Sequence, residues 1–586
     1  MINSTNLLTQ KLNILQQQSL PKEKPEINNP AITSPNSGLI SKYLQNVAMI
    51  NAAAVSKVKS EINTPPVNFK NDLRTLFANN QAKILAIIPR TFNAKDTNGN
   101  EYIDGNEQHG TFLNAIDRLD ELKNDGFNTI HLLPIHPPGK EKAMSTAGSL
   151  YSPKNMLEID PRLIDPNDPR SDKEQFKAFT DECHKRGIKV MMDLPSCASY
   201  DMFLERPELM AIERDGLAKT PQGWNDIRMF QPWEDEGKEI LNPALLKLHK
   251  DFIDWCIDLG VDGIRADVAR AKPLKFWQII IPYSRMKDPE FGWLAETYTY
   301  EDASPQANMP YDRPEDSLRA GFDTFYGQYH IFHEWSNASE FIEYVEKMLT
   351  MSKDMPGKSL IGSFATHDDM SPMFHGGTEY CNLTMGLQAT LPMLNPYIVD
   401  GYQTGDWYKY GYGKQNINDL MKKDNTLITS DTGEEEMFVH YGKLDIFNLS
   451  RKPGGNNPEI GDFMRSAFKL KDNYANIINK GSFIELSKID DKNDQIIAYA
   501  RHLDGKTLLV VANQSLNRSV ACKVKVPTLK ASQDLTNLLP SYGQESILQA
   551  SANELRVDLG PGRIHVFEIN TPNIKQYSNK VYRQNL

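Results

Sequence analysis

Short apolar runs recur along the chain, and each is followed by polar turn residues and then by a longer segment. The eight runs occupy residues 83–89, 129–135, 189–194, 263–268, 292–297, 321–326, 360–367 and 396–401. Between them, apolar residues at helical spacing predict helices over about 112–122, 172–186, 245–259 and 340–351. Near-continuous apolar strands that alternate with helices are typical of a parallel sheet covered on both faces.

Eight such strand–helix units indicate the α/β class and, as the most economical closure, a (β/α)₈ TIM barrel over residues 76–192 and 246–480. A doubly wound open sheet is the competing architecture. No GxGxxG sequence follows the first strand, which disfavours that alternative.

Three parts of the chain depart from this pattern. Residues 1–75 are rich in Asn, Gln, Ser and Pro, and we expect a flexible polar leader there. The connection after the third strand is rich in Trp, Pro, Gly and charge, which predicts a small inserted domain over 193–245. After residue 480 the runs 496–503, 507–514, 522–526, 554–560 and 564–570 read as strands without intervening helices, so 481–586 is expected to form an antiparallel β domain with a tail.

Composition narrows the possible partners of this 586-residue chain. Sixty-five Lys and Arg against 76 Asp and Glu give a net charge of −11, which disfavours nucleic acid and anionic membranes. No apolar run approaches the roughly 18 residues of a membrane span. The first residues lack an apolar signal core, and the five cysteines are scattered and odd in number. We therefore expect a cytoplasmic protein, whose oligomeric state the sequence leaves open.

In a barrel the chemistry lies at the carboxyl ends of the strands, and ionisable side chains end four of the eight predicted strands. Asp193 ends the third strand and Glu296 ends the fifth; Arg265 with Asp267 ends the fourth, and His367 with Asp368 ends the seventh. Residues two apart on a strand project to the same side. Arg265 and Asp267 are therefore expected to face the barrel mouth together, with the guanidinium holding the carboxylate in place.

Three carboxyl groups that converge from different strands suit glycosidic bond cleavage. One attacks the sugar carbon, one delivers a proton to the leaving oxygen, and one stabilises the positive charge of the transition state. Each acid alone could equally be a solvated turn residue or a helix cap. Four such strand ends, one acid beside Arg and one beside His, favour a catalytic site.

These segments carry a family resemblance. Residues 262–270 (DGIRADVAR), 292–297 (GWLAET) and 364–369 (FATHDD) resemble three signature strands of the α-amylase superfamily, glycoside hydrolase family 13, and 187–198 resembles a further one. The resemblance extends from about Lys83 to Asn570. The members of the superfamily that the chain resembles are amylases, oligoglucosidases and maltosyltransferase-like proteins. It implies that Asp267 is the nucleophile, Glu296 the general acid/base and Asp368 the transition-state stabiliser. It also implies substrate-binding roles for Arg265, His367, Tyr151 and Asp193.

The sequence also departs from the family pattern. Cys197 and Ala198 stand where the family usually has Asn and His, and Ser152 stands where a sugar-binding Asp is expected. Thr366 replaces the usual Asn before His-Asp. Some maltosyl-transferring branches also lose the Asn-His pair, and the inserted segment 213–233 is loosely similar to those branches.

A loop after the first strand has the composition of a calcium site. Asp96, Asn98, Asn100 and Asp104 alternate oxygen donors, and the Tyr102 carbonyl is available between them. Glu101 stands where an EF-hand needs Gly, which excludes that motif. The loop is similar to the calcium site of oligoglucosidase-like members, so a structural Ca²⁺ is expected. An Asn-Gly turn with solvated acids is the alternative.

The sequence therefore predicts a retaining glycosidase that hydrolyses α-linked glucose chains, with an α-glucan or maltooligosaccharide as substrate. Two alternatives remain open. One is a glucosyl- or maltosyltransferase of the same superfamily, in which a sugar hydroxyl rather than water reaches the covalent intermediate. The other is a catalytically silent glucan-binding protein, suggested by Ala198 and Ser152 but disfavoured by the retention of all three acids.

Overall fold

The structure is a computed structural model, and the residues it describes lie between Phe69 and Asn585. They are 69–95, 97, 107–143, 149–221, 226–298, 319–369, 371–406, 428–429, 435–436, 457–540, 547–570, 577–578 and 580–585. Residues 1–68, most of the predicted leader, therefore lie outside the described residues. Within the described part, no helix combines the length and the apolar character needed to cross a membrane.

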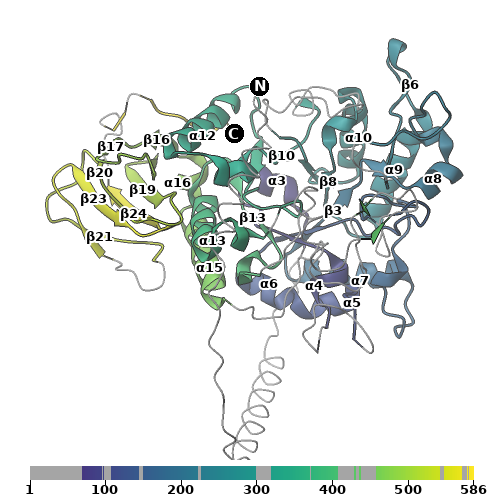
Figure 1. Cartoon of the computed structure of the whole chain (residues 1–586), viewed down its shortest axis with the longest axis horizontal. Coiled ribbons are helices and arrows are strands. Elements are labelled where there is room, and N and C mark those ends of the chain that lie inside the picture. Colours follow the sequence, from purple (N-terminus) through teal and green to yellow (C-terminus); the bar gives the residue numbers. More distant parts are fainter. Residues whose placement is uncertain are drawn as a thin grey trace, which may run out of the picture. The chain divides into compact units, whose positions relative to one another are not determined.

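A ring of parallel strands forms the centre of the fold (Figure 1). The strands are β1 (Ile84–Ile87), β2 (Thr129–Leu132), β3 (Lys189–Leu194), β8 (Gly263–Ala266), β9 (Gly292–Ala295), β10 (Thr324–Phe325), β11 (Ser359–Ile361), β12 (Leu394–Asn395) and β13 (Tyr397–Val399). They pair in the order β12-β11-β10-β9-β8-β3-β2-β1-β13. All eight predicted runs contain a strand of this sheet, which confirms the predicted fold class.

The eighth predicted strand begins at Pro396 and contains β13, and a further short strand, β12, directly precedes the proline; β12 and β13 together close the ring. β12 pairs with β11 on one side of the proline, and β13 pairs with β1 on the other. A proline has no N–H to donate to a neighbouring strand. Its carbonyl still accepts from the backbone N–H of Ile84 at 2.9 Å, so the first and last strands stay joined across the break.

Helices cover the outside of the ring. They are α5 (Phe112–Ala115), α6 (Leu119–Asp125), α7 (Asp172–Lys185), α9 (Pro243–Asp258), α10 (Leu274–Lys287), α12 (Ala338–Met351), α13 (Pro372–Thr390), α15 (Pro458–Asn473) and α16 (Ala475–Lys480). The predicted helix over 112–122 is divided by a 3-10 turn at Ile116–Arg118. The other three predicted helices begin and end within two residues of the expected bounds. Local sequence explains two starts: Ser171 and Glu174 form a capping box on α7, and Asn242 caps α9 ahead of Pro243.

A short helix lies against the amino-terminal end of the barrel. α3 (Leu73–Ala78) buries Leu73 and Phe77 completely, in one cluster with interior barrel residues such as Met191 and Leu294. Packed structure thus begins before residue 76, within the range assigned to the leader. A Cβ built on Gly292 would lie 2.7 Å from the Leu73 side chain, so this glycine makes room for the helix.

The segment between β3 and α9 forms the small inserted unit that the fold prediction placed after the third strand. It contains α8 (Tyr200–Glu205) and two antiparallel pairs, β4 (Cys197–Ala198) with β5 (Arg228–Met229) and β6 (Trp233–Asp235) with β7 (Ile240–Leu241). The pair β4–β5 begins three residues after β3, close to the barrel mouth.

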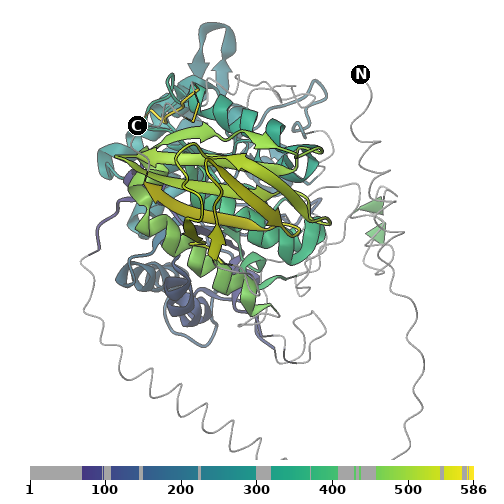
Figure 2. The same cartoon turned by 90° about the vertical axis from the view of Figure 1, so that its left-hand side faces the viewer.

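The C-terminal part consists of antiparallel sheets, which face the viewer in Figure 2. One sheet contains β16 (Ser482–Glu485), β18 (Ile496–Leu503), β19 (Lys506–Asn513) and β24 (Ile564–Asn570). A second contains β17 (Lys488–Ile489), β20 (Val520–Lys525) and β23 (Glu554–Leu559), and β21 (Asp534–Thr536) pairs with β22 (Ile547–Gln549). The five predicted strands are confirmed, and the antiparallel order agrees with the predicted fold class.

The first of these sheets is buried on both faces. Along β18, Ile497 and Tyr499 join the core that includes the barrel helices, whereas Ala498 and Ala500 join the core between the two sheets. The Tyr499 hydroxyl and Thr390 of α13 form a hydrogen bond at 2.6 Å. Double-sided burial explains why this strand reads as an almost continuous apolar run rather than as an alternating one.

Candidate active site

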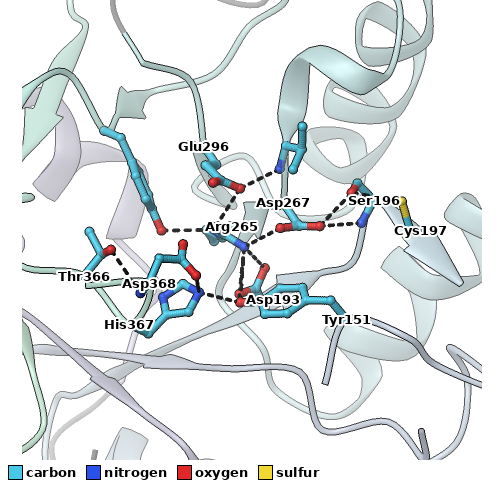
Figure 3. A network of polar contacts seen from close by, with 12 residues as sticks. Tyr151, Asp193, Ser196, Cys197, Arg265, Asp267, Glu296, Thr366, His367 and Asp368 are labelled. Carbon is cyan, nitrogen blue, oxygen red and sulfur yellow. Dashed lines mark hydrogen bonds and ion pairs between the residues drawn. The ribbon is translucent and has the colours of Figure 1, made fainter. Parts of the chain in front are cut away.

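Arg265 is the centre of the polar network at the carboxyl end of the barrel (Figure 3). Its guanidinium is 1% exposed and contacts three carboxyl groups: Asp193 at 2.8 Å, Asp267 at 3.0 Å and Glu296 at 2.7 Å. Its Nε also donates to the Tyr326 hydroxyl at 3.1 Å. A buried charge is tolerated only where it is paired, so the guanidinium and the carboxylates hold one another in place.

Asp193, at the end of β3, lies beneath this site with no exposed surface. Burial alone would raise the pKa of Asp193, but the guanidinium of Arg265 and His131, whose Nε2 lies 3.4 Å from Oδ2, lower it to about 2. Its Oδ2 also accepts the Tyr151 hydroxyl at 2.8 Å. Asp193 therefore fixes Arg265 and Tyr151 in place, and its predicted part in substrate binding acts through these two side chains.

Asp267 follows β8, and both of its carboxylate oxygens have donors. Oδ1 accepts from Arg265 Nη1 at 3.0 Å, and Oδ2 accepts from the backbone N–H and the hydroxyl of Ser196 at 2.9 and 2.7 Å. Its side chain remains 12% exposed. Asp267 thus combines fixed orientation with access to the barrel mouth, as a nucleophile requires.

Glu296 follows β9 and shares the guanidinium of Arg265 with Asp267. Its Oε2 also accepts the backbone N–H of Val268 at 2.7 Å. Burial is the main cause that raises the pKa of Glu296 to about 8; Asp267 and Asp368 raise it further and Arg265 opposes them. At neutral pH this carboxyl is mostly protonated, which suits a general acid.

The Val268 backbone that donates to Glu296 is strained. Its φ of 36° and ψ of 58° place a β-branched residue in the left-handed region. Such strain persists only where the surrounding contacts enforce it, and it is commonly found at functional sites. Here the conformation turns an N–H towards the carboxyl of Glu296 directly after the candidate nucleophile.

Asp368 and His367, after β11, complete the site. Asp368 is the most exposed of the three acids, with 32% of its side chain accessible, and burial of the group raises its pKa to about 6. His367 Nε2 lies 2.7 Å from the Tyr151 hydroxyl, which itself donates to Asp193, so this nitrogen carries the proton. Burial lowers the pKa of His367 to about 3, which keeps the ring neutral.

The substituted family positions have structural partners of their own. The Ser152 hydroxyl donates to the Asp226 carbonyl at 2.7 Å and so ties the loop after β2 to the inserted segment. Cys197 and Ala198 are buried in β4. The Thr366 hydroxyl donates to Asp369 at 2.9 Å and accepts the backbone N–H of Asp368. Ser152, Cys197 and Ala198 therefore lack the side chains with which the family residues at these positions are expected to contact a sugar.

The structure thus brings together all seven predicted catalytic and substrate-binding side chains: Tyr151, Asp193, Arg265, Asp267, Glu296, His367 and Asp368. Their chemical roles remain predictions. Asp96, Asn98, Asn100, Tyr102 and Asp104 of the predicted calcium loop lie outside the described residues. Only the base of that loop is described, where the backbone N–H of Lys95 donates to the Gln108 carbonyl at 2.8 Å.

Sequence reasoning missed several members of the network. Tyr326 ends the sixth strand, and the rule that found the acids would have found its phenol had tyrosines been included. His131 lies on β2, 2.9 Å from the Tyr397 hydroxyl. Ser196 lies two residues beyond β3, and Lys272 donates to its carbonyl at 3.0 Å. Ser196 and Lys272 carry no sequence signal, because their contacts depend on how the loops fold over the barrel mouth.

Comparison with known proteins shows which proteins the chain resembles. No family model matches the chain. The chain is 25% identical over 313 residues to an alpha-1,4-glucan:maltose-1-phosphate maltosyltransferase of Cereibacter sphaeroides, an alignment that covers 49% of this chain and 42% of the relative. It is 24% identical over 444 residues to the protein of the same name from Bifidobacterium animalis subsp. lactis, covering 70% of this chain and 53% of the relative. The chain thus spans about half the length of the curated relatives it matches.

Among solved structures, an alpha-amylase from Lactobacillus plantarum superposes with a TM-score of 0.60 at 20% identity, covering 84% of this chain and all of that chain. At this identity the match shows a shared fold. Together, the sequence relatives and the shared fold confirm the predicted resemblance to the α-amylase superfamily and its maltosyltransferase-like members.

Proposed function

We propose that the chain is a retaining enzyme that acts on α-linked glucose chains and transfers a glucosyl or maltosyl unit to the hydroxyl of an acceptor sugar. One observation carries the proposal: Asp267 and Glu296 bind the two ends of one buried guanidinium, and burial raises the pKa of Glu296 to about 8. Shared binding favours the short carboxyl separation of about 5 Å that is typical of retaining enzymes.

The two carboxyl groups perform the first step. A lone pair of Asp267 forms the bond to the anomeric carbon as the bond to the leaving group breaks. Where the leaving group is a sugar oxygen, it takes the proton of Glu296. Asp368, the most exposed acid, stabilises the positive charge that develops on the ring. Tyr151 and His367 form the wall on the donor side.

The second step decides between transfer and hydrolysis. Glu296 is ionised at this stage, either because it protonated a sugar leaving group or because it released its proton to solvent, and it takes the proton of the incoming hydroxyl. The oxygen of that hydroxyl forms the new bond to the anomeric carbon as the bond from that carbon to Asp267 breaks, with its electron pair returning to the carboxylate. A sugar acceptor gives transfer, and water gives hydrolysis. The sequence alone predicts hydrolysis, but the similarity to alpha-1,4-glucan:maltose-1-phosphate maltosyltransferases supports transfer instead, with maltose 1-phosphate as the donor to test.

Incubation with maltose 1-phosphate and glycogen tests this proposal. Transfer releases inorganic phosphate in equal amount to the maltosyl units added to glycogen, with little free maltose. Incubation with maltooligosaccharides alone gives chain-length redistribution for a transferase that uses glucan donors. Free maltose or new reducing ends as the main product would replace transfer by hydrolysis, and no product from either donor would leave a catalytically silent glucan-binding protein.

A further inference from the structure

The two oxygens of the Asp267 carboxylate are held differently. Oδ1 has one donor, the Arg265 guanidinium at 3.0 Å. Oδ2 has two donors on a single residue, the Ser196 backbone N–H at 2.9 Å and the Ser196 hydroxyl at 2.7 Å. An oxygen that accepts two hydrogen bonds holds its lone pairs in those bonds, so Oδ1 is the freer of the two to attack a carbon atom.

Ser196 is itself fixed by a buried cation. The Lys272 ammonium donates to the Ser196 carbonyl at 3.0 Å and lies 5.1 Å from the centre of the Phe230 ring. Lys272 is only 3% exposed. Burial lowers the pKa of Lys272 to about 8, against the opposing effect of Asp267 and Cys197, so the group is still mostly charged at neutral pH. The Lys272 side chain is held in one conformation behind Ser196, and it anchors the turn from which Ser196 donates both hydrogen bonds.

We propose that Ser196 and Lys272 are positioning residues that hold Oδ2 of Asp267 as the carbonyl oxygen of the covalent sugar ester and thereby speed release of the sugar to the acceptor. This inference rests on the proposed function and adds to it the reaction step that the two residues control. Neither residue contacts the reacting carbon in this assignment; Ser196 acts through Asp267, and Lys272 acts through Ser196.

The charge on the Asp267 carboxylate decides which reaction step the Ser196 donors speed. Hydrogen bonds to an ionised carboxylate are roughly twice as strong as those to a neutral acceptor such as an ester carbonyl. In the second step Asp267 is the leaving group and regains its negative charge, so the Ser196 donors stabilise that transition state. In the first step the same donors stabilise the free carboxylate and make it a slightly poorer nucleophile. Ser196 therefore favours turnover of the intermediate over its formation.

The test uses α-maltosyl fluoride, whose fluoride departs without needing a proton and whose release can be followed with an electrode. Ser196→Ala removes the hydroxyl and leaves the backbone donor, and Ser196→Thr restores a hydroxyl. Lys272→Met removes the ammonium and keeps the length of the side chain. Ser352→Ala is the matched control, because Ser352 is also buried and its hydroxyl donates to the Leu349 carbonyl at the end of α12, outside the network.

For Ser196→Ala we expect a burst of fluoride followed by a steady rate about tenfold below that of the wild type. KM should fall with kcat, so kcat/KM stays within about threefold, because an accumulating intermediate lowers both. The intact mass should show the protein carrying one maltosyl unit, with the ester on Asp267. Lys272→Met should show the same pattern more weakly, and Ser196→Thr and Ser352→Ala should behave as the wild type.

Two results would overturn the inference alone: a Ser196→Ala enzyme that matches the wild type, or one whose kcat/KM falls as far as kcat without any burst or covalent adduct. The second pattern would mean that Ser196 only maintains the shape of the site. If Ser196→Ala does not fold, Lys272→Met tests the inference instead, and the same two results in that variant would overturn it. A wild-type protein that releases no fluoride would overturn the proposed function and, with it, this inference.

Discussion

The Arg265 side chain determines the chemistry of the mouth, because three carboxylates depend on it. With Asp193 ionised beneath it and Asp267 and Glu296 on its two outer nitrogens, one guanidinium places both acids that a double displacement needs. The pKa values then diverge by environment: about 2 for Asp193, which is fully paired, and about 8 for Glu296, which is buried among other acids. Asp193 therefore stays ionised beneath the guanidinium, whereas Glu296 holds the proton that a general acid needs.

Replacement of the candidate nucleophile is the first prediction. Asp267→Asn keeps the shape and the Ser196 hydrogen bonds but replaces the attacking oxygen by a weaker nucleophile. Turnover should fall by several orders of magnitude, each tenfold corresponding to ~1.4 kcal/mol of barrier. Steady-state rates checked against an unchanged circular dichroism spectrum measure this. A variant with even a tenth of the wild-type rate would exclude Asp267 from that role.

The second prediction concerns pH. Because the pKa of Glu296 is raised to about 8 and its protonated form is needed, kcat/KM for a sugar leaving group should fall as pH rises through about 8. Glu296→Gln should abolish this activity yet still form the covalent intermediate from α-maltosyl fluoride, whose leaving group needs no proton. Measurement of kcat/KM from about pH 6 to 10 tests this pH dependence. A flat profile across that range would contradict the assignment of Glu296 as the acid.

The sequence predicted the acids and the arginine because their positions follow from strand ends, which the apolar pattern locates. It could not predict the donors that hold them. The Val268 N–H faces Glu296 only because the backbone there is left-handed, and Ser196 meets Asp267 only because the turn after β3 folds over the mouth. Such contacts depend on loop geometry, and no local pattern encodes them.

At the scale of elements, regular strands and helices were predictable and their interruptions were not. The predicted eighth strand began at Pro396 and contained β13, but it missed the two-residue strand β12 just before the proline. The kink in α13 could have been read from the adjacent Gly376 and Gly377, which have non-helical backbone angles. Helix α3 is six residues long, which is too short to show a helical period next to the polar leader, and its apolar side chains pack against the amino-terminal end of the barrel.

The third prediction tests that role. Leu73 is completely buried against the amino-terminal end of the barrel, so Leu73→Ala should lower the free energy of unfolding by about 2–5 kcal/mol. Activity at low temperature should persist, because the active site is at the opposite end of the strands. Chemical denaturation measures the change. Leu204→Ala, at a position 58% exposed, is the control, and equal stability of the two variants would show that α3 contributes nothing to the barrel.

The calcium loop after β1 gives the fourth prediction. If Asp96, Asn98, Asn100, the Tyr102 carbonyl and Asp104 bind Ca²⁺, a chelator should lower the melting temperature, since a ligand that binds only the folded state stabilises it. Asp96→Ala should be less stable with calcium present and insensitive to the chelator. Asp251→Ala, on the exposed side of α9, should keep the wild-type response. Identical melting curves of the wild type with and without chelator would indicate a plain turn.

At the scale of the whole molecule, the barrel, its inserted unit and the C-terminal sheets share the order along the chain that the sequence predicted. β18 contributes one face to the core of the barrel helices and the other to the core of the second sheet, so the two regions are packed through one strand. This order was predictable because the barrel alternates strand-like and helix-like segments, the C-terminal part has strand-like runs without helices, and the inserted segment follows neither pattern. The choice between water and sugar as acceptor was not, since it depends on how segments far apart in sequence shape the approach to the intermediate.

The central claim is a double displacement through Asp267, and the configuration of the first product tests it most directly. Two displacements at one carbon restore the original configuration, so α-maltosyl fluoride must give an α-configured product, either an α-linked transfer product or α-maltose. Proton NMR recorded within the first minutes, before mutarotation, distinguishes the anomers. We predict early signals of the α-anomer alone. Early accumulation of the β-anomer would mean a single displacement and would contradict both the covalent intermediate and the role assigned to Asp267.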